Sequence, residues 1–280
     1  MPKLKVSDVE LYYEETGSGF PVIFCHEFAG DYRNWEPQVR HFARRYRVIT
    51  YNYRGYKPSD IPTDPASYSQ DILIADMRAL MQRLSIPQAH IVGIATGGNV
   101  ALNFAIAHPE MTKSAIVAGA GAGTVRREGW LANGAKMAAG MRTIGAEAIA
   151  QSIDKAPQRQ ALRIKDPRAW DEFMAIIRDL DPEGAALSML HVLQTRKPIT
   201  DLTEEIAKLA MPVLVMVGDQ DTPAWEPMLL LHQHLKHGGL AVLPVTGHTL
   251  PVEEPELFNL LVEQFLSAVD SGRWGTWGAV

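Results

Sequence analysis

The chain has 280 residues, of which 46% are hydrophobic and 21% charged, a composition that predicts a globular protein with a large core and excludes a disordered chain. A formal charge of −5 leaves no basic surplus for nucleic acid, so we expect a small-molecule partner. The single cysteine excludes an internal disulfide. No segment reaches the ~20 apolar residues of a membrane span, so we expect no membrane contact and a cytoplasmic location.

Short β-type runs alternate with helical patterns along the chain, which is typical of βαβ units. The runs that predict strands are residues 22–25, 46–52, 90–94, 114–118, 213–217 and 240–245. Several of them are apolar throughout, as expected of strands that helices cover on both faces. We therefore predict an α/β fold with a mostly parallel central sheet flanked by helices.

Two helices are predicted beside these strands. Apolar residues recur at helical spacing at Leu73, Met77, Leu80, Met81 and Leu84. Ser67, with Gln70 three residues later, matches a capping box and predicts that this helix starts after Ser67. A second helix is predicted from Gly97 to the residues before Pro109, because the residue that precedes a proline resists the α conformation.

The alternation stops at residue 124, and residues 124–202 carry helical patterns only. We predict a helical cap over this range, inserted into a core formed by residues 1–123 and 203–280. The alternative is a set of ordinary crossover helices in one uninterrupted domain. Methionine and aromatic side chains supply adaptable apolar surface, so four cap residues are predicted to bind substrate, namely Trp130, Met137, Met141 and Met174.

A glycine-flanked turn follows the predicted strand 90–94. Gly93, Gly97 and Gly98 surround Ala95 where the strand passes into a helix, and glycine is needed where backbone passes close to backbone. This segment resembles the nucleophile elbow of the α/β-hydrolase superfamily, which reads G-x-S-x-G. Ala95 stands in the serine position. The chain is thus similar to the serine esterases and lactonases of that superfamily.

The resemblance extends over nearly the whole chain, because further segments follow in the family's order. His26, Glu27 and Phe28, after the predicted strand 22–25, look like the segment that supplies one oxyanion-hole amide. Glu27 departs from the usual glycine. The resemblance implies an oxyanion hole formed by the backbone N–H groups of Phe28 and Thr96.

Two later segments resemble those from which the family draws its acid and its base. Asp219 and Asp221 follow the predicted strand 213–217, and the resemblance implies Asp221 as the acid, with Asp219 as the weaker alternative. His248, after the predicted strand 240–245, is implied as the general base. Residue 95, Asp221 and His248 then follow the nucleophile, acid and histidine order of this fold.

These residue types belong together because a serine hydroxyl is a weak nucleophile. A histidine must take its proton, and a buried carboxylate must orient the imidazole. The resemblance implies a hydrolase of carboxylic esters or lactones that works through an acyl-enzyme and is inactivated here by Ala95. The alanine is either an engineered replacement of serine or a natural loss of the nucleophile.

Three other functions stay open. A natural loss of the nucleophile would leave a non-catalytic small-molecule binding protein. A carbon–carbon bond hydrolase would use the same triad. A base-only lyase or oxygenase would use His248 and Asp221 alone. A displaced nucleophile at Thr96 is disfavoured because its side chain should point elsewhere.

No metal or cofactor is predicted. His232 and His234 lie two residues apart in a helical pattern and do not share a helix face, so a solvated surface is expected. The glycine-rich segments lack the lysine of a phosphate loop and the spacing of a dinucleotide site. The oligomeric state is left open, with a homodimer as one option.

Overall fold

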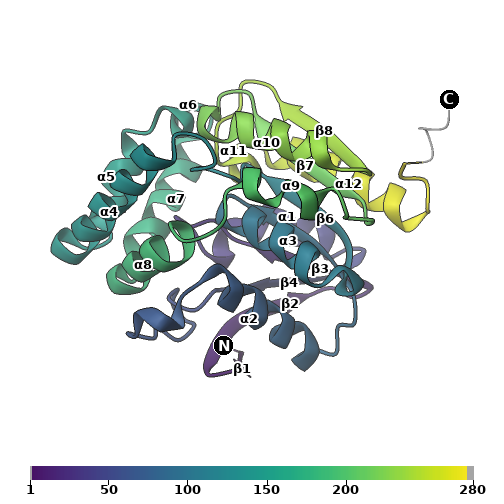
Figure 1. Cartoon of the computed structure of the whole chain (residues 1–280), viewed down its shortest axis with the longest axis horizontal. Coiled ribbons are helices and arrows are strands. Elements are labelled where there is room, and N and C mark those ends of the chain that lie inside the picture. Colours follow the sequence, from purple (N-terminus) through teal and green to yellow (C-terminus); the bar gives the residue numbers. More distant parts are fainter. Residues whose placement is uncertain (1, 276–280) are drawn as a thin grey trace.

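The computed structural model describes residues 2–275 and contains an eight-stranded sheet with helices on both faces (Figure 1). The strands are β1 (Lys3–Val6), β2 (Val9–Thr16), β3 (Phe20–Cys25), β4 (Tyr46–Tyr51), β5 (Ala89–Ile94), β6 (Thr112–Ala118), β7 (Val213–Gly218) and β8 (Gly238–Leu243). The six predicted strands correspond to β3 through β8, with every end within two residues of its predicted position. The predicted α/β class is confirmed.

The strand order is β1-β2-β4-β3-β5-β6-β7-β8, and all pairs from β4 to β8 are parallel. β1 and β2 pair antiparallel, and β2 pairs antiparallel with β4. In the central pair β3–β5, Cys25 lies opposite Gly93. This register brings the chain that leaves β3, with His26 and Glu27, next to the turn that follows β5.

Successive strand residues pack against helices on opposite faces of the sheet. Because both faces are covered, several strands are apolar throughout. Phe24, Val92 and Leu214 face one layer, whereas Ile23 and Ile91 face the other. The helices around the sheet are α1 (Glu36–Phe42), α2 (Gln70–Arg83), α3 (Thr96–Ala107), α9 (Thr203–Ile206), α10 (Thr222–His234), α11 (Leu250–Glu253) and α12 (Pro255–Asp270). The side chains of α1 and α12 share the first layer, and those of α2 and α3 the second.

The predicted capping box of α2 is wrong. Ser69 is the N-cap, and its hydroxyl accepts a hydrogen bond from the backbone N–H of Ile72 at 3.1 Å. Ser67 ends a separate turn, Pro65–Ser67, and Tyr68 then adopts an extended backbone. A helix cannot continue through that residue, so it starts two residues later than the pattern indicated.

In the described part of the chain, the connection from β6 to β7 contains helices and turns but no strand. Between residues 124 and 202, its helices are α4 (Arg127–Ile144), α5 (Glu147–Asp154), α6 (Gln160–Lys165), α7 (Pro167–Asp179) and α8 (Pro182–Ser188), followed by a π-helical turn (Met189–Leu193). They gather at one side of the sheet, at the left of Figure 1. We call residues 124–202 the helical segment. Its buried core is continuous with the sheet layer that packs on α2 and α3.

Among the described residues, no helix is both long and apolar enough to cross a membrane.

Candidate active site

Ala95 lies at a sharp turn between β5 and α3. Its φ of 52° and ψ of −109° are a conformation that side-chain-bearing residues rarely adopt. The turn is held by two hydrogen bonds, from Ala95 N to the carbonyl of Ala118 at 2.9 Å and from the Asn99 side-chain amide to the carbonyl of Ala95 at 2.8 Å. A sharp turn of this kind between a strand and a helix is the geometry of a nucleophile elbow.

Two glycines of the motif are required by close backbone approach. A Cβ at Gly93 would lie 2.0 Å from the carbonyl oxygen of Gly97, and a Cβ at Gly97 would lie 1.9 Å from that of Cys25. Both distances are far inside van der Waals contact, so any larger residue would force the backbone apart. The glycine pattern therefore fixes the elbow against the end of β3.

His248 and Asp221 form a short side-chain hydrogen bond. Nδ1 of His248 lies 2.6 Å from Oδ2 of Asp221. The Asp221 side chain is fully buried, whereas the imidazole of His248 retains 13% exposure. Gly119, with a φ of 50°, makes room for the pair, because a Cβ there would lie 3.2 Å from Oδ2. The contact orients the imidazole and directs its other nitrogen, Nε2, away from Asp221.

Asp219 makes a different contact. Its carboxylate accepts a hydrogen bond from the backbone N–H of Thr246 at 3.0 Å and so braces the loop that carries His248. Of the two aspartates after β7, only Asp221 contacts the imidazole.

The helical segment helps to hold the histidine loop. The backbone N–H of His248 donates to the carbonyl of Gln158 at 2.8 Å. A Cβ at the neighbouring Gly247 would lie 2.1 Å from that carbonyl oxygen. The turn Pro157–Arg159 is therefore packed directly on the loop that positions the imidazole.

The segment after β3 is fixed by His26. Its Nδ1 lies 2.7 Å from the carbonyl of Glu27, and its Nε2 accepts a hydrogen bond from Tyr53 N at 3.3 Å. Burial lowers the pKa of His26 to about 4, so the ring is neutral near pH 7. Tyr56 donates to the carbonyl of Phe28 at 3.1 Å. These contacts hold Phe28 at the edge of the site.

A cavity of about 280 Å³ connects the sequence-predicted residues. It is lined by Phe28, Ala95, Thr96, Trp130, Met137, Asp221 and His248, together with other residues of the helical segment. Met141 and Met174 do not line it, contrary to the prediction. Both are buried in the core of the helical segment, because their positions on α4 and α7 face neighbouring helices.

Glu27 and Arg159 also line the cavity, as a buried ion pair that the sequence did not reveal. Nη1 of Arg159 lies 3.0 Å from Oε1 of Glu27, and Nη2 lies 2.5 Å from Oε2. Burial alone would raise the pKa of Glu27, but the guanidinium of Arg159 holds it below its usual value. The departure from glycine at residue 27 was the one sequence signal, and its partner lies 132 residues away.

Arg196 is a second arginine on the cavity wall that the sequence did not reveal. It is 7% exposed, and its Nη2 donates to the carbonyl of Ala122 at 2.7 Å. Its guanidinium carbon lies 5.2 Å from the centre of the Trp130 ring. Within residues 2–275, no carboxylate forms an ion pair with it.

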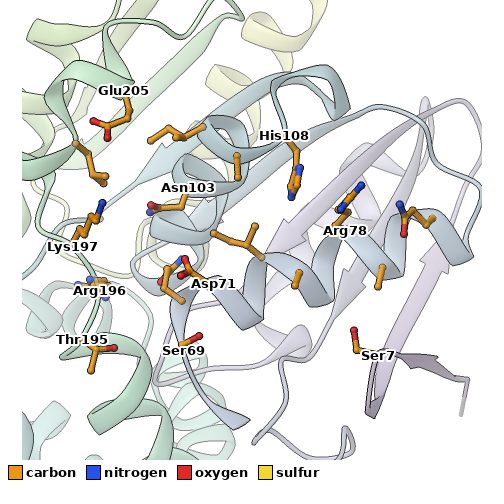
Figure 2. Close-up of a pocket in the computed structure, with 18 residues that line it drawn as sticks. Ser7, Ser69, Asp71, Arg78, Asn103, His108, Thr195, Arg196, Lys197 and Glu205 are labelled. Carbon is orange, nitrogen blue, oxygen red and sulfur yellow. The ribbon is translucent and has the colours of Figure 1, made fainter. Parts of the chain in front are cut away.

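A larger hollow, of about 760 Å³, lies outside this site. Figure 2 shows Asp71 of α2 on the side of Arg196 and Lys197, and Arg78 of α2 near His108, which follows α3. None of Ala95, Asp221 and His248 lines this outer groove. Arg196 borders both hollows.

The histidines of α10 do not assemble a site. In the part of the chain that the structure describes, no group of three or more histidine, cysteine, aspartate or glutamate side chains could hold a metal ion.

The fold and the site agree with comparisons to known proteins. Residues 21–255 match the family model for the alpha/beta hydrolase fold. The chain is 30% identical to 3-oxoadipate enol-lactonase 2 of Acinetobacter baylyi over 266 residues, which cover 93% of this chain and 94% of that protein. The chain therefore belongs to the α/β-hydrolase family.

Solved structures give the same result. A thermophilic esterase from Thermogutta terrifontis, described with malate bound, has 26% identity and a TM-score of 0.86, with 96% of this chain and 99% of that chain covered. The enol-lactonase of Burkholderia xenovorans LB400 shares the fold, with a TM-score of 0.83 at 23% identity and coverage of 95% and 100%. The three proteins compared with this chain are thus named as enol-lactonases or an esterase.

Proposed function

We propose that the protein has the site of a carboxylic ester or lactone hydrolase and, with alanine at residue 95, binds such a ligand without turning it over. The observation that carries the proposal is the 2.6 Å contact between His248 and Asp221 in a cavity that Ala95 also lines. The lactonase and esterase names of its relatives support the choice of substrate class.

With serine at residue 95, the chemistry would follow from the positions of the other groups. Nε2 of His248 takes the hydroxyl proton while the serine oxygen attacks the ester carbonyl. The oxyanion that forms would accept hydrogen bonds from the backbone N–H groups of Phe28 and Thr96. The imidazolium gives its proton to the leaving alkoxide, and water then hydrolyses the acyl-enzyme by the same route.

Alanine removes the one atom that forms the covalent bond and leaves the acid, the base and the cavity. The present chain is therefore proposed to act as a small-molecule binder at this site. The intact His248–Asp221 pair also favours a second candidate, in which His248 acts as a base on a bound ligand without an acyl-enzyme.

The test is Ala95→Ser with 4-nitrophenyl acetate as substrate. Removal of a triad nucleophile costs on the order of 10⁶ in turnover in serine hydrolases, so we expect a gain of several orders of magnitude. Mass spectrometry should detect a covalent adduct at residue 95 with an organophosphonate.

The matched control is Ala95→Ser combined with His248→Ala, which should abolish both turnover and labelling. If the folded Ala95→Ser protein neither hydrolyses activated esters nor becomes labelled, the hydrolase proposal is wrong. Proton abstraction by His248 or binding alone would then replace it.

A further inference from the structure

Arg196 differs from the other charged residues of the cavity wall. Glu27 is paired with Arg159, and Asp221 is held by His248. The guanidinium of Arg196 donates to a backbone carbonyl and lies over an aromatic ring, and no carboxylate of the described residues pairs with it. A positive charge is therefore buried on this wall without a negative partner.

Burying a charge without a partner costs free energy, so the groups around the Arg196 guanidinium decide how it is held. Burial and the nearby charge of Arg127 lower the pKa of Arg196 to about 10, which still leaves it protonated near pH 7. The hydrogen bond to Ala122 and the cation–π contact with Trp130 hold the guanidinium at the cavity wall. The remaining N–H groups of a guanidinium so held are suited to a planar anion.

We propose that Arg196 binds a carboxylate of the ligand, so that the ligand class is an ester or lactone that carries a separate acid group. This inference rests on the proposed function and deepens it. The ester carbonyl would lie at residue 95 and His248, and the free carboxylate at Arg196, since all three line one cavity of about 280 Å³. A cavity of that size accommodates a small mono-acid ester.

Monomethyl glutarate and dimethyl glutarate form a matched pair of probes, because they differ by one methyl group and one charge. Calorimetric titration of the unaltered protein should show tighter binding of the monoester by about 10- to 100-fold, the range for a hydrogen bond to a charged group. Equal or tighter binding of the diester, or no binding of the monoester, would overturn the proposal.

Arg196→Met should remove this preference, and Arg196→Lys should keep part of it, because lysine retains the charge but loses the planar donor pair. Thermal unfolding shows whether each variant is folded. If Arg196→Met does not fold, the comparison of the two esters in the unaltered protein and in Arg196→Lys still decides the matter. A folded Arg196→Met protein that keeps the full preference contradicts the inference.

Lys197→Met is the matched control. Lys197 lines the outer groove in Figure 2 but not the inner cavity, so its loss should leave the preference for the monoester unchanged. If Lys197→Met abolishes the preference instead, the anion binds in the outer groove and the assignment to Arg196 is wrong.

The two proposals can fail separately. Hydrolysis of 4-nitrophenyl acetate by Ala95→Ser tests the hydrolase proposal with a neutral ester that does not need Arg196. The binding experiments use the alanine protein and need no turnover.

Discussion

The two walls of the cavity are built in different ways. On the sheet side, Ala95 follows β5, Asp221 lies after β7 and His248 lies after β8, and backbone hydrogen bonds fix their loops. On the helical side, Arg159 and Arg196 reach the cavity as long side chains held by a carboxylate, a ring and a carbonyl. Under the proposed function, the strand ends would set the reaction geometry, and the side chains of the helical wall would select the ligand.

The walls are joined near the turn Pro157–Arg159. Glu27 on the sheet side binds Arg159, and the backbone of His248 binds that of Gln158. The helical segment is thus attached to both the loop after β3 and the histidine loop. Changes at this junction should affect stability more than changes elsewhere on the helical wall.

The largest difference between two variants compared here is expected in turnover, between substitutions of the two aspartates of the sheet wall. In the Ala95→Ser background, Asp221→Asn should lower turnover by about 10⁴, because the imidazole loses the carboxylate that sets its tautomer. Asp219→Asn should cost far less, since Asp219 contacts Thr246 rather than His248. Steady-state hydrolysis of 4-nitrophenyl acetate measures both. A larger loss at Asp219 would contradict the assignment.

The second largest effect is expected on stability, at the junction between the two walls. Glu27→Gln should lower the free energy of unfolding by about 3–5 kcal/mol, because it leaves the Arg159 charge buried and unpaired. Denaturant unfolding measures this change. The double variant Glu27→Met with Arg159→Met removes both charges and should recover much of the loss. A double variant as unstable as Glu27→Gln would show that the charge itself is not the cause.

A smaller effect should appear with pH on the sheet side. His26 has a pKa of about 4 in the folded protein, because of its burial, and about 6.5 when unfolded. The unfolded chain therefore binds the extra proton first, and stability should fall by about 3 kcal/mol as pH drops from 6.5 to 4.

Denaturant midpoints across that range, compared between the unaltered chain and His26→Gln, would measure this contribution. His90, whose pKa burial also lowers to about 4, contributes over the same window and is unchanged in the variant. The variant should therefore retain part of the pH dependence. An identical dependence in both proteins would show that His26 is not a source.

The smallest effect concerns the elbow. Ala95→Ser should change the free energy of unfolding by no more than about 1 kcal/mol, because the glycines and not residue 95 accommodate the close backbone contacts. Thermal unfolding measures it. A much larger loss would mean that the turn in this protein depends on alanine.

Much of the sheet wall was predictable from the sequence. The apolar runs predicted β3 to β8, and the glycine spacing around Ala95 predicted the turn that the backbone contacts of Gly93 and Gly97 enforce. Strand patterns and glycine turns are local properties, so a single sequence carries them. The N-terminal strands β1 and β2 were missed because their apolar signal is weak. β1 is a four-residue edge strand with one buried residue, and only three of the eight residues of β2 are buried.

The helical wall was decided by tertiary structure. Helical spacing identified apolar faces on α4 and α7, but it could not tell whether a face packs on the cavity or on other helices. In the folded chain, Met137 lines the cavity, whereas Met141 is buried in the core. The same holds for the two arginines. Whether a guanidinium is buried, and whether a carboxylate lies beside it, depends on chain segments far away in sequence. Only the packed fold pairs Arg159 with Glu27 and leaves Arg196 without a carboxylate partner among the described residues.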